Sequence, residues 1–287
     1  MTQPQTAPAA RTDAAQWTGA NGDVWAAEWQ RTDRSFAPLT AELDRAISES
    51  MGGRAIAVAD IGSGAGGTSI AAAGTHDSAQ VTGFDISPAL VAVAQERAAG
   101  LPNCRFVAGP AEQRIGEAGP FDLIVSRHGV MFFDDPVDAF TRLRAAARPG
   151  AGLIFSCFRA PSLNAWAREL MAVLPGGGAK PAGYEPGPFA FADADFVRVL
   201  LAEAGWTDVA ARPVDFAYRA GEGSDPVADA VAFFSRIGPA ARALKLAPPA
   251  QRGAIFAATE AVCRARLVGD VVEFPAAAWI WSARNPD

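Results

Sequence analysis

The sequence has few residues of the kinds that build metal centres and disulfide frameworks. Three cysteines and two histidines occur among its 287 residues, and Cys104, Cys157 and Cys263 lie far apart without the short spacings of metal ligands. We therefore expect no metal site. We interpret the cysteines as reduced thiols of a cytoplasmic protein, where disulfides are rare.

Basic residues are also scarce. The chain has 25 Lys and Arg against 31 Asp and Glu, which gives a net charge of −6. A domain that binds long RNA or DNA needs a basic face to neutralise phosphates, so we expect no nucleic-acid partner. No apolar run approaches the roughly 20 residues that cross a bilayer, and the first residues lack the apolar core of a signal peptide. We therefore expect no membrane span, and the oligomeric state stays open.

A glycine-rich stretch follows the first apolar run. Ala55–Thr68 reads Ala-Ile-Ala-Val-Ala-Asp-Ile-Gly-Ser-Gly-Ala-Gly-Gly-Thr. The apolar residues predict a buried parallel strand over 55–60, and the glycines predict a tight turn with a helix starting near Gly67. Glycine suits a turn at which a ligand approaches the backbone closely. The free N–H groups of the following helix favour a carboxylate or a phosphate.

Two classes of ligand use such a turn. Gly62, Gly64 and Gly67 fit the G-x-G-x-x-G pattern of dinucleotide binders. Asp60, with glycines at 62, 64 and 66, fits D-x-G-x-G-x-G, which resembles the first motif of class I S-adenosylmethionine-dependent methyltransferases. A carboxylate here would repel a pyrophosphate and favour the ammonium and sulfonium of a methionine moiety. A turn that only connects strand to helix is the structural alternative.

A second acidic residue ends the next strand. Asp85 closes the apolar run that begins near Gln80, and it lies 25 positions after Asp60. A carboxylate at this place can accept hydrogen bonds from both hydroxyls of a ribose. Ser87 and Pro88 then predict a helix cap and a first helical position. Ribose binding suits NAD equally well, so Asp60 remains the discriminating residue.

Strands and helices alternate along the middle of the chain. Strands are predicted at 55–60, 80–84, 104–108, 121–126 and 152–158, with helices near 68–73, 88–99 and 136–147. This alternation predicts an α/β fold, a doubly wound Rossmann-like sheet with its ligand at the carboxyl ends of the strands. The final strands, 206–218 and 271–283, make seven in all, mostly parallel, and the last is expected to be antiparallel.

The run from Phe121 to Pro136 carries the most specific resemblance. It resembles the F-D-L-I-x-S-R-x-G-x-M-F-F-x-D-P segment of the bacterial type 11 methyltransferase group, whose fold the ubiquinone/menaquinone-biosynthesis methyltransferases share. The resemblance extends roughly from Trp17 to Trp281 and is strongest over 60–158. It implies a cofactor, S-adenosyl-L-methionine, that is converted to S-adenosyl-L-homocysteine.

The resemblance also implies a set of cofactor-binding residues. Ser126 and Arg127 should flank the methionine end of the cofactor. Pro110 replaces the acidic residue that often reads adenine in related enzymes, so this contact falls to the backbone of Ala111 and to Glu112. The complete set implied is Asp60, Gly62, Ser63, Gly64, Gly66, Asp85, Ile86, Ala111, Glu112, Ser126 and Arg127.

His128 stands where that segment more usually has an apolar aromatic residue. A histidine at the mouth of a strand, beside the expected methyl group, is a candidate general base or substrate anchor. A structural histidine is the alternative. His128 is the candidate catalytic residue of this sequence.

The remaining segments predict a tail, a lid and a cap around one domain, 16–287. Residues 1–15 are expected to be a disordered tail, and 16–50 to form short lid helices that carry Trp17 and Trp25. Insertions at 160–190 and 221–270, the latter with two helices, are expected to cap the substrate. Tyr184 lies in a Gly/Pro-rich loop that should reach over the same strand ends.

These features predict methyl transfer to a small-molecule acceptor. A nicotinamide-dependent oxidoreductase is the alternative enzyme, although the sequence has no Tyr-x-x-x-Lys hydride-site pair and Asp60 disfavours a pyrophosphate. A third possibility is a non-catalytic cofactor-binding protein with the same fold, because fold does not fix function.

Overall fold

A sheet of eight strands runs through the computed structural model, which describes residues 14–52, 55–175 and 183–286. The strand order is β3-β2-β1-β4-β5-β8-β6, and the short β7 pairs with β8. The first five strands are β1 (Ala57–Ile61), β2 (Gln80–Asp85), β3 (Cys104–Ala108), β4 (Phe121–Arg127) and β5 (Ala147–Phe158). They pair in parallel, whereas β8 (Val271–Arg284) is antiparallel to both β5 and β6 (Thr207–Gly221). The predicted Rossmann-like α/β fold is confirmed.

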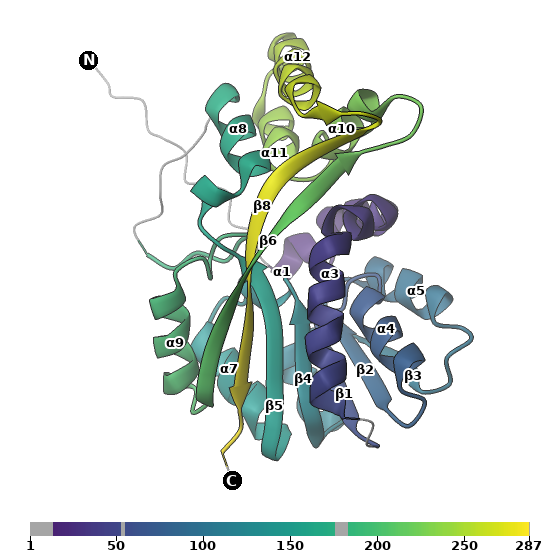
Figure 1. Cartoon of the computed structure of the whole chain (residues 1–287), viewed down its shortest axis with the longest axis vertical. Coiled ribbons are helices and arrows are strands. Elements are labelled where there is room, and N and C mark those ends of the chain that lie inside the picture. The colour runs from purple at the N-terminus through teal and green to yellow at the C-terminus, as the bar shows by residue number, and fades with distance from the viewer. Residues whose placement is uncertain (1–13, 53–54, 176–182, 287) are drawn as a thin grey trace.

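Helices cover both faces of the sheet (Figure 1). One face carries α3 (Trp29–Met51), α4 (Gly67–Thr75) and α5 (Pro88–Arg97), and the other carries α6 (Ala111–Arg114), α7 (Pro136–Ala145) and α9 (Ala194–Glu203). Three central strands are almost wholly buried, because they lie between these two layers. The core is continuous across the sheet, with Phe84, Phe121, Phe140 and Phe155 among its largest fully buried side chains.

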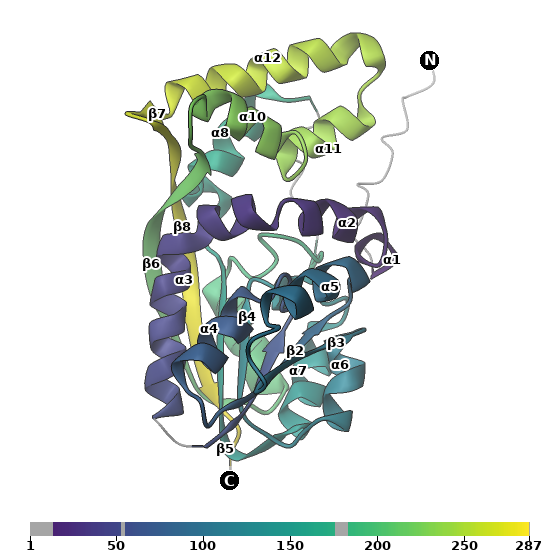
Figure 2. The ribbon, with the colours of Figure 1, turned by 90° about the vertical axis from the view of Figure 1, so that its right-hand side faces the viewer.

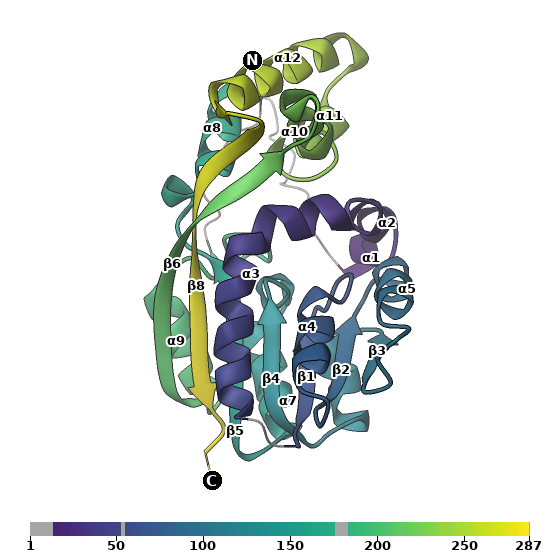
Figure 3. The same ribbon diagram turned by 45° about the vertical axis from the view of Figure 1, so that its right-hand side comes forward.

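The N-terminal segment differs from the expected short helices. After α1 (Ala14–Trp17) and α2 (Ala20–Ala27), the single helix α3 runs for 23 residues. It bends, so that one part packs along the sheet and the other crosses above the strand ends (Figure 3). Pro38 lies inside α3 and lacks the N–H that an unbroken helix uses, which accounts for a bend. Of the expected tail, 1–15, residues 1–13 lie outside the described residues.

Two long strands carry the cap away from the sheet (Figure 2). β6 and β8 pair from Thr207 to Gly221 and reach beyond the ends of the parallel strands. The cap consists of α8 (Ala165–Val173), α10 (Pro226–Phe234), α11 (Pro239–Leu246) and α12 (Pro249–Ala265), with β7 (Leu267–Val268) joining α12 to β8. The expected two cap helices between β6 and β8 are therefore three, because α10 ends at Phe234 and Gly238 and Pro239 start the additional helix α11.

The expected helix over 136–147 ends at Ala145 instead. Ala147 already belongs to β5 and lies opposite Phe121, so Pro149 and Gly150 are strand residues and not a helix stop. Within the described residues no helix is both long and apolar enough to span a bilayer.

Candidate functional site

The glycine turn joins β1 to α4 at the carboxyl edge of the sheet. Gly62, Gly64 and Gly66 have φ values of 63°, 55° and 83°, a region that side chains with a Cβ rarely adopt. A Cβ on Gly62 would lie 2.7 Å from Cα of Gly129, in the turn after β4, so the two turns pack directly together. A Cβ on Gly64 would meet no heavy atom within 4 Å. Gly64 thus presents bare backbone to open space.

Asp60 is a buried carboxylate at the start of this turn. Its side chain is 1% exposed, and its Oδ2 accepts a hydrogen bond from the Ser69 hydroxyl at 2.6 Å. Oδ1 is buried and has no hydrogen-bond partner among the described residues. Burial raises the pKa of Asp60 to about 7. An unpaired oxygen in a dry site favours a cation beside it, because a buried charge needs compensation.

Asp85 connects the second strand to the glycine turn. Its Oδ2 accepts from the N–H of Gly64 and its Oδ1 from the N–H of Ser87, both at 2.8 Å. Burial raises the pKa of Asp85, and these two hydrogen bonds oppose that shift. Each carboxylate oxygen keeps a lone pair for a ligand hydroxyl. Ser87 caps α5 as predicted, accepting from the N–H of Leu90 at 3.3 Å.

Two further hydroxyls near the turn are buried, and neither has a hydrogen-bond partner in the part of the chain that the structure describes. They are Oγ of Ser63, in the turn itself, and Oγ1 of Thr68, in the first turn of α4. Buried polar atoms in folded proteins are nearly always hydrogen-bonded, so unpaired ones mark places where a polar ligand completes the site. With Asp60 and Asp85, they fit a ligand that carries hydroxyls and a positive charge.

Ser126 and Arg127 end β4 beside the turn. The hydroxyl of Ser126 donates to the carbonyl of Ile61 at 2.7 Å and accepts from the N–H of Gly129 at 3.1 Å, so it holds the two turns together. Arg127 extends toward α3, where its guanidinium donates to Asp33 at 2.6 Å and to Thr40 at 3.0 Å.

The candidate adenine contacts follow β3. Pro110 is the N-cap of α6, so the N–H groups of Ala111 and Glu112 belong to a first helical turn and have no helical partner. Ala111 is buried and Glu112 is half-buried. The N–H of Gly109 donates to the carbonyl of Asp85 at 2.9 Å. This turn therefore lies beside Asp85, the candidate ribose-binding residue. Ile86 is half-buried and follows Asp85 directly.

His128 is held in an unusual backbone conformation between β4 and the glycine turn. Its φ is 64°, and its side chain is 9% exposed. Nδ1 lies 2.8 Å from Oγ of Ser156, whereas Nε2 is buried and has no partner within the described ranges. Phe36 and Phe158 contact the ring at centroid distances of 4.9 and 4.5 Å. Burial, with the nearby Arg127, lowers the pKa of His128 to about 3.

The lid helices lie against the same edge of the sheet. A Cβ on Gly22 of α2 would lie 2.3 Å from the Ser87 hydroxyl, so α2 rests on the start of α5. The Trp17 ring contacts Trp25 at 5.7 Å and Phe132, in the turn after β4, at 5.1 Å. The two tryptophans predicted for the lid therefore lie together.

Tyr184 lies against the segment that follows β4. The hydroxyl donates to the carbonyl of Phe133 at 2.6 Å, and the ring stacks on Phe196 of α9. These contacts fix the loop before α9. Residues 176–182 of the predicted loop lie outside the described residues.

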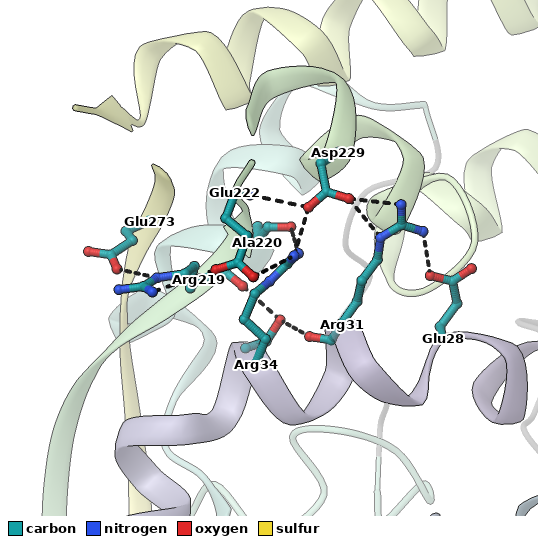
Figure 4. A network of polar contacts seen from close by, with 9 residues as sticks. Glu28, Arg31, Arg34, Arg219, Ala220, Glu222, Asp229 and Glu273 are labelled. Atoms are coloured by element: carbon teal, nitrogen blue, oxygen red, sulfur yellow. Dashed lines mark hydrogen bonds and ion pairs between the residues drawn. The ribbon is translucent and has the colours of Figure 1, made fainter. Parts of the chain in front are cut away.

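An ion-pair network links the lid to the cap (Figure 4). Asp229 of α10 binds Arg31 and Arg34 of α3, each at 2.8 Å, and also accepts from the N–H of Glu222 at 3.2 Å. Arg34 donates to the carbonyl of Ala220 at the end of β6. Sequence reasoning missed this network and the Asp33–Arg127 pair, because the partners lie far apart along the chain and each looks like an ordinary surface charge.

A family described as a methyltransferase domain matches residues 58–150, the segment that holds the glycine turn, Asp85 and the end of β4. The part of the chain that holds the candidate site is therefore similar to a methyltransferase domain. The predicted methyltransferase class is thereby confirmed. The matched segment includes every predicted cofactor residue, while the lid and the cap lie outside it.

Known methyltransferases resemble parts or most of this chain. It is 29% identical over 105 residues to malonyl-[acyl-carrier protein] O-methyltransferase of Halalkalibacterium halodurans, a match that covers 36% of this chain and 39% of that protein. The match thus spans well under half of the curated relative. The CurJ carbon methyltransferase has a TM-score of 0.57 at 16% identity, covering 96% of this chain and 61% of that one. Phosphoethanolamine N-methyltransferase 2 of Haemonchus contortus, solved with S-adenosyl-L-methionine, has a TM-score of 0.55 at 14% identity, with 96% and 60% covered. At these identities, the two structures show a shared fold.

Proposed function

We propose that this chain transfers a methyl group from S-adenosylmethionine to a small-molecule acceptor and leaves S-adenosylhomocysteine. The unpaired buried oxygen of Asp60, at the bare backbone of the glycine turn, is the observation that carries the proposal. It favours a cationic ligand over a pyrophosphate, and the cofactor's ammonium and sulfonium supply that charge. The relative solved with S-adenosyl-L-methionine supports the same choice.

Each part of the cofactor has candidate partners in this chain. Asp85 would accept from the ribose hydroxyls, while the backbone at Ala111 and the side chain of Glu112 would contact adenine. Asp60 would face the ammonium, and Arg127 would face the carboxylate of the methionine moiety. The hydroxyl of Ser63 supplies a further hydrogen bond beside the turn.

The cofactor supplies the reactive methyl group on its sulfonium when bound, so the protein's task is to position the acceptor in line with it and to exclude water. The lid contacts the sheet edge close to Asp85, because Gly22 packs against Ser87. The cap is joined to the lid through Asp229. A closed site suits a reaction in which positive charge disperses, because open water stabilises the concentrated charge of the reactant.

His128 is better suited to hold the methyl acceptor by a hydrogen bond than to act as a general base. With a pKa of about 3, its imidazole is neutral at physiological pH and a weak proton acceptor. Ser156 is fully buried, and its hydroxyl has His128 Nδ1 as a hydrogen-bond partner. If Ser156 donates to Nδ1, Nε2 carries the proton and donates to the acceptor. An acceptor that is already anionic or aminic needs no stronger base.

A small acceptor fits both the charge and the architecture. The net charge of −6 disfavours long nucleic acids. The rings around His128 extend from Phe158 to Trp166 of α8, at a centroid distance of 5.3 Å, so the wall toward the cap is aromatic. These surroundings favour a fairly apolar molecule with an oxygen or nitrogen that accepts the methyl group.

Calorimetric titration tests the choice of cofactor. S-adenosylmethionine and S-adenosylhomocysteine are expected to bind in the micromolar range, whereas NADH is expected to show no saturable heat. Binding of NADH alone would favour the oxidoreductase and overturn the proposal. If the cofactor binds but none of a panel of phenols, carboxylates and amines yields S-adenosylhomocysteine, the result favours a non-catalytic cofactor-binding protein.

A further inference from the structure

Asp33 of α3 is the acidic partner of two arginines, one from β4 and one from α5, near the carboxyl edge of the sheet. Its Oδ1 accepts from Arg127, the last residue of β4, at 2.6 Å, and its Oδ2 accepts from Arg97 of α5 at 2.9 Å. Arg97 also donates to the carbonyl of Ala65 in the glycine turn at 2.6 Å and lies over the Trp29 ring at 3.9 Å. One carboxylate from the lid thus bridges the two guanidiniums.

This carboxylate lies over the beginning of α4. A Cβ on Gly67, the first residue of that helix, would lie 3.4 Å from Oδ1 of Asp33 and 3.6 Å from the terminal nitrogens of Arg127. A helix N-terminus and an adjacent guanidinium both attract a carboxylate. Thr68, the residue after Gly67, has a buried hydroxyl without a hydrogen-bond partner among the described residues.

We propose that Asp33 occupies the carboxylate position of the cofactor site and competes with the cofactor's methionine carboxylate for Arg127. This inference rests on the proposed function. On binding, the ligand carboxylate replaces Asp33 on Arg127, while Asp33 keeps its pair with Arg97. Asp33 therefore lowers the affinity for ligands that carry the methionine carboxylate and leaves the affinity for those without it unchanged.

The alternative role for Asp33 has the opposite sign. A residue that merely orients Arg127, or that binds the ligand's ammonium, would strengthen cofactor binding. Neutralising it would then weaken that binding. The sign of the change in affinity therefore separates the two roles, and the chemical group responsible follows from which ligands respond.

Three ligands separate the contributions of carboxylate and ammonium. S-adenosylhomocysteine carries both groups, decarboxylated S-adenosylhomocysteine carries the ammonium alone, and methylthioadenosine carries neither. For Asp33→Asn, calorimetry is expected to show S-adenosylhomocysteine binding tighter by about three- to tenfold, with the other two unchanged within about twofold. In an Arg127→Gln background, the same substitution is expected to have no effect on S-adenosylhomocysteine.

A matched variant controls for loosening of the lid. Asp229→Asn also removes a charge that holds two arginines of α3, in this case on the side of α3 that faces the cap. This variant is expected to leave the ranking of the three ligands unchanged. Weaker or equal binding of S-adenosylhomocysteine to Asp33→Asn would overturn the inference alone. Failure of all three ligands to bind the wild type would overturn the proposed function as well.

Discussion

The carboxylate of Asp85 accepts a hydrogen bond from the backbone N–H of Gly64 at 2.8 Å. This contact ties the end of the second strand to the middle of the glycine turn, so the ribose candidate and the turn form one unit. The positive φ of Gly64 aims its N–H at Asp85 and leaves the other side of its Cα open. The two acidic strand ends are therefore positioned before any ligand arrives.

Replacing Asp85 by Asn is expected to weaken cofactor binding by roughly tenfold or more, because an amide replaces a charged acceptor. One of its two backbone donors also loses its acceptor, so stability should fall by about 1–2 kcal/mol. Calorimetry with S-adenosylhomocysteine and urea unfolding measure the two effects.

Asp122→Asn is the matched control for this substitution. Asp122 likewise accepts from a backbone N–H, that of Ala57 at 2.8 Å, but at the opposite end of the sheet. It should cost stability without changing cofactor affinity. Equal affinities for Asp85→Asn and the wild type would remove Asp85 from the ribose site.

Asp60 should make the stability of the free protein fall as pH rises toward neutrality. Its folded-state pKa of about 7 exceeds the ordinary 3.8, so the folded state holds a proton that the unfolded state has released between these values. The stabilisation is fully present below the lower value and is lost as pH rises through about 7. Asp60→Asn should abolish this part of the pH dependence in urea unfolding. Burial also raises the pKa of Asp44, to about 6, so Asp44→Asn is the variant for comparison.

Cofactor binding should release a proton from Asp60 near neutral pH. A cation beside Oδ1 favours the ionised carboxylate, so the affinity should increase as pH rises through about 7. Calorimetry in buffers of different ionisation heat counts the released protons. Proton release that persists undiminished in Asp60→Asn would show that the cation does not bind there.

His128→Ala is expected to lower turnover with any acceptor that the wild type methylates, and to leave cofactor affinity within about twofold. Because the pKa of His128 is about 3, it should add no ionisation to the turnover profile between about pH 5 and 9. His76→Ala is the comparison, since His76 instead pairs with Ser48 at 2.9 Å, at the far end of α4. Unchanged turnover in His128→Ala would leave the residue with a packing role.

Local patterns predicted the strands, the glycine turn and the acidic strand ends, because each depends on neighbours within a few residues. Asp60 and Asp85 could be found this way. Asp33 and Asp229 could not, since their partners come from other elements: Arg127 lies 94 positions after Asp33. The length of α3 was also missed, because Pro38 resembles a helix stop, whereas the burial of Leu39, Leu43 and Ile47 sustains the helix beyond it.

The lid–cap network yields a prediction about stability. Asp229 is 19% exposed and binds two arginines, so Asp229→Asn removes the charged partner that these two partly buried guanidiniums share. Arg31 keeps its pair with Glu28, and Arg34 keeps Glu222 and the carbonyl of Ala220, so the loss is partial. We expect a loss of about 1–2 kcal/mol in urea unfolding, between the values typical of exposed and buried pairs. Glu260→Gln removes an exposed pair with Arg264 within α12 and should cost less than about 0.5 kcal/mol. Equal losses in the two variants would mean that Asp229 is an ordinary surface charge and that lid and cap are held together by apolar packing.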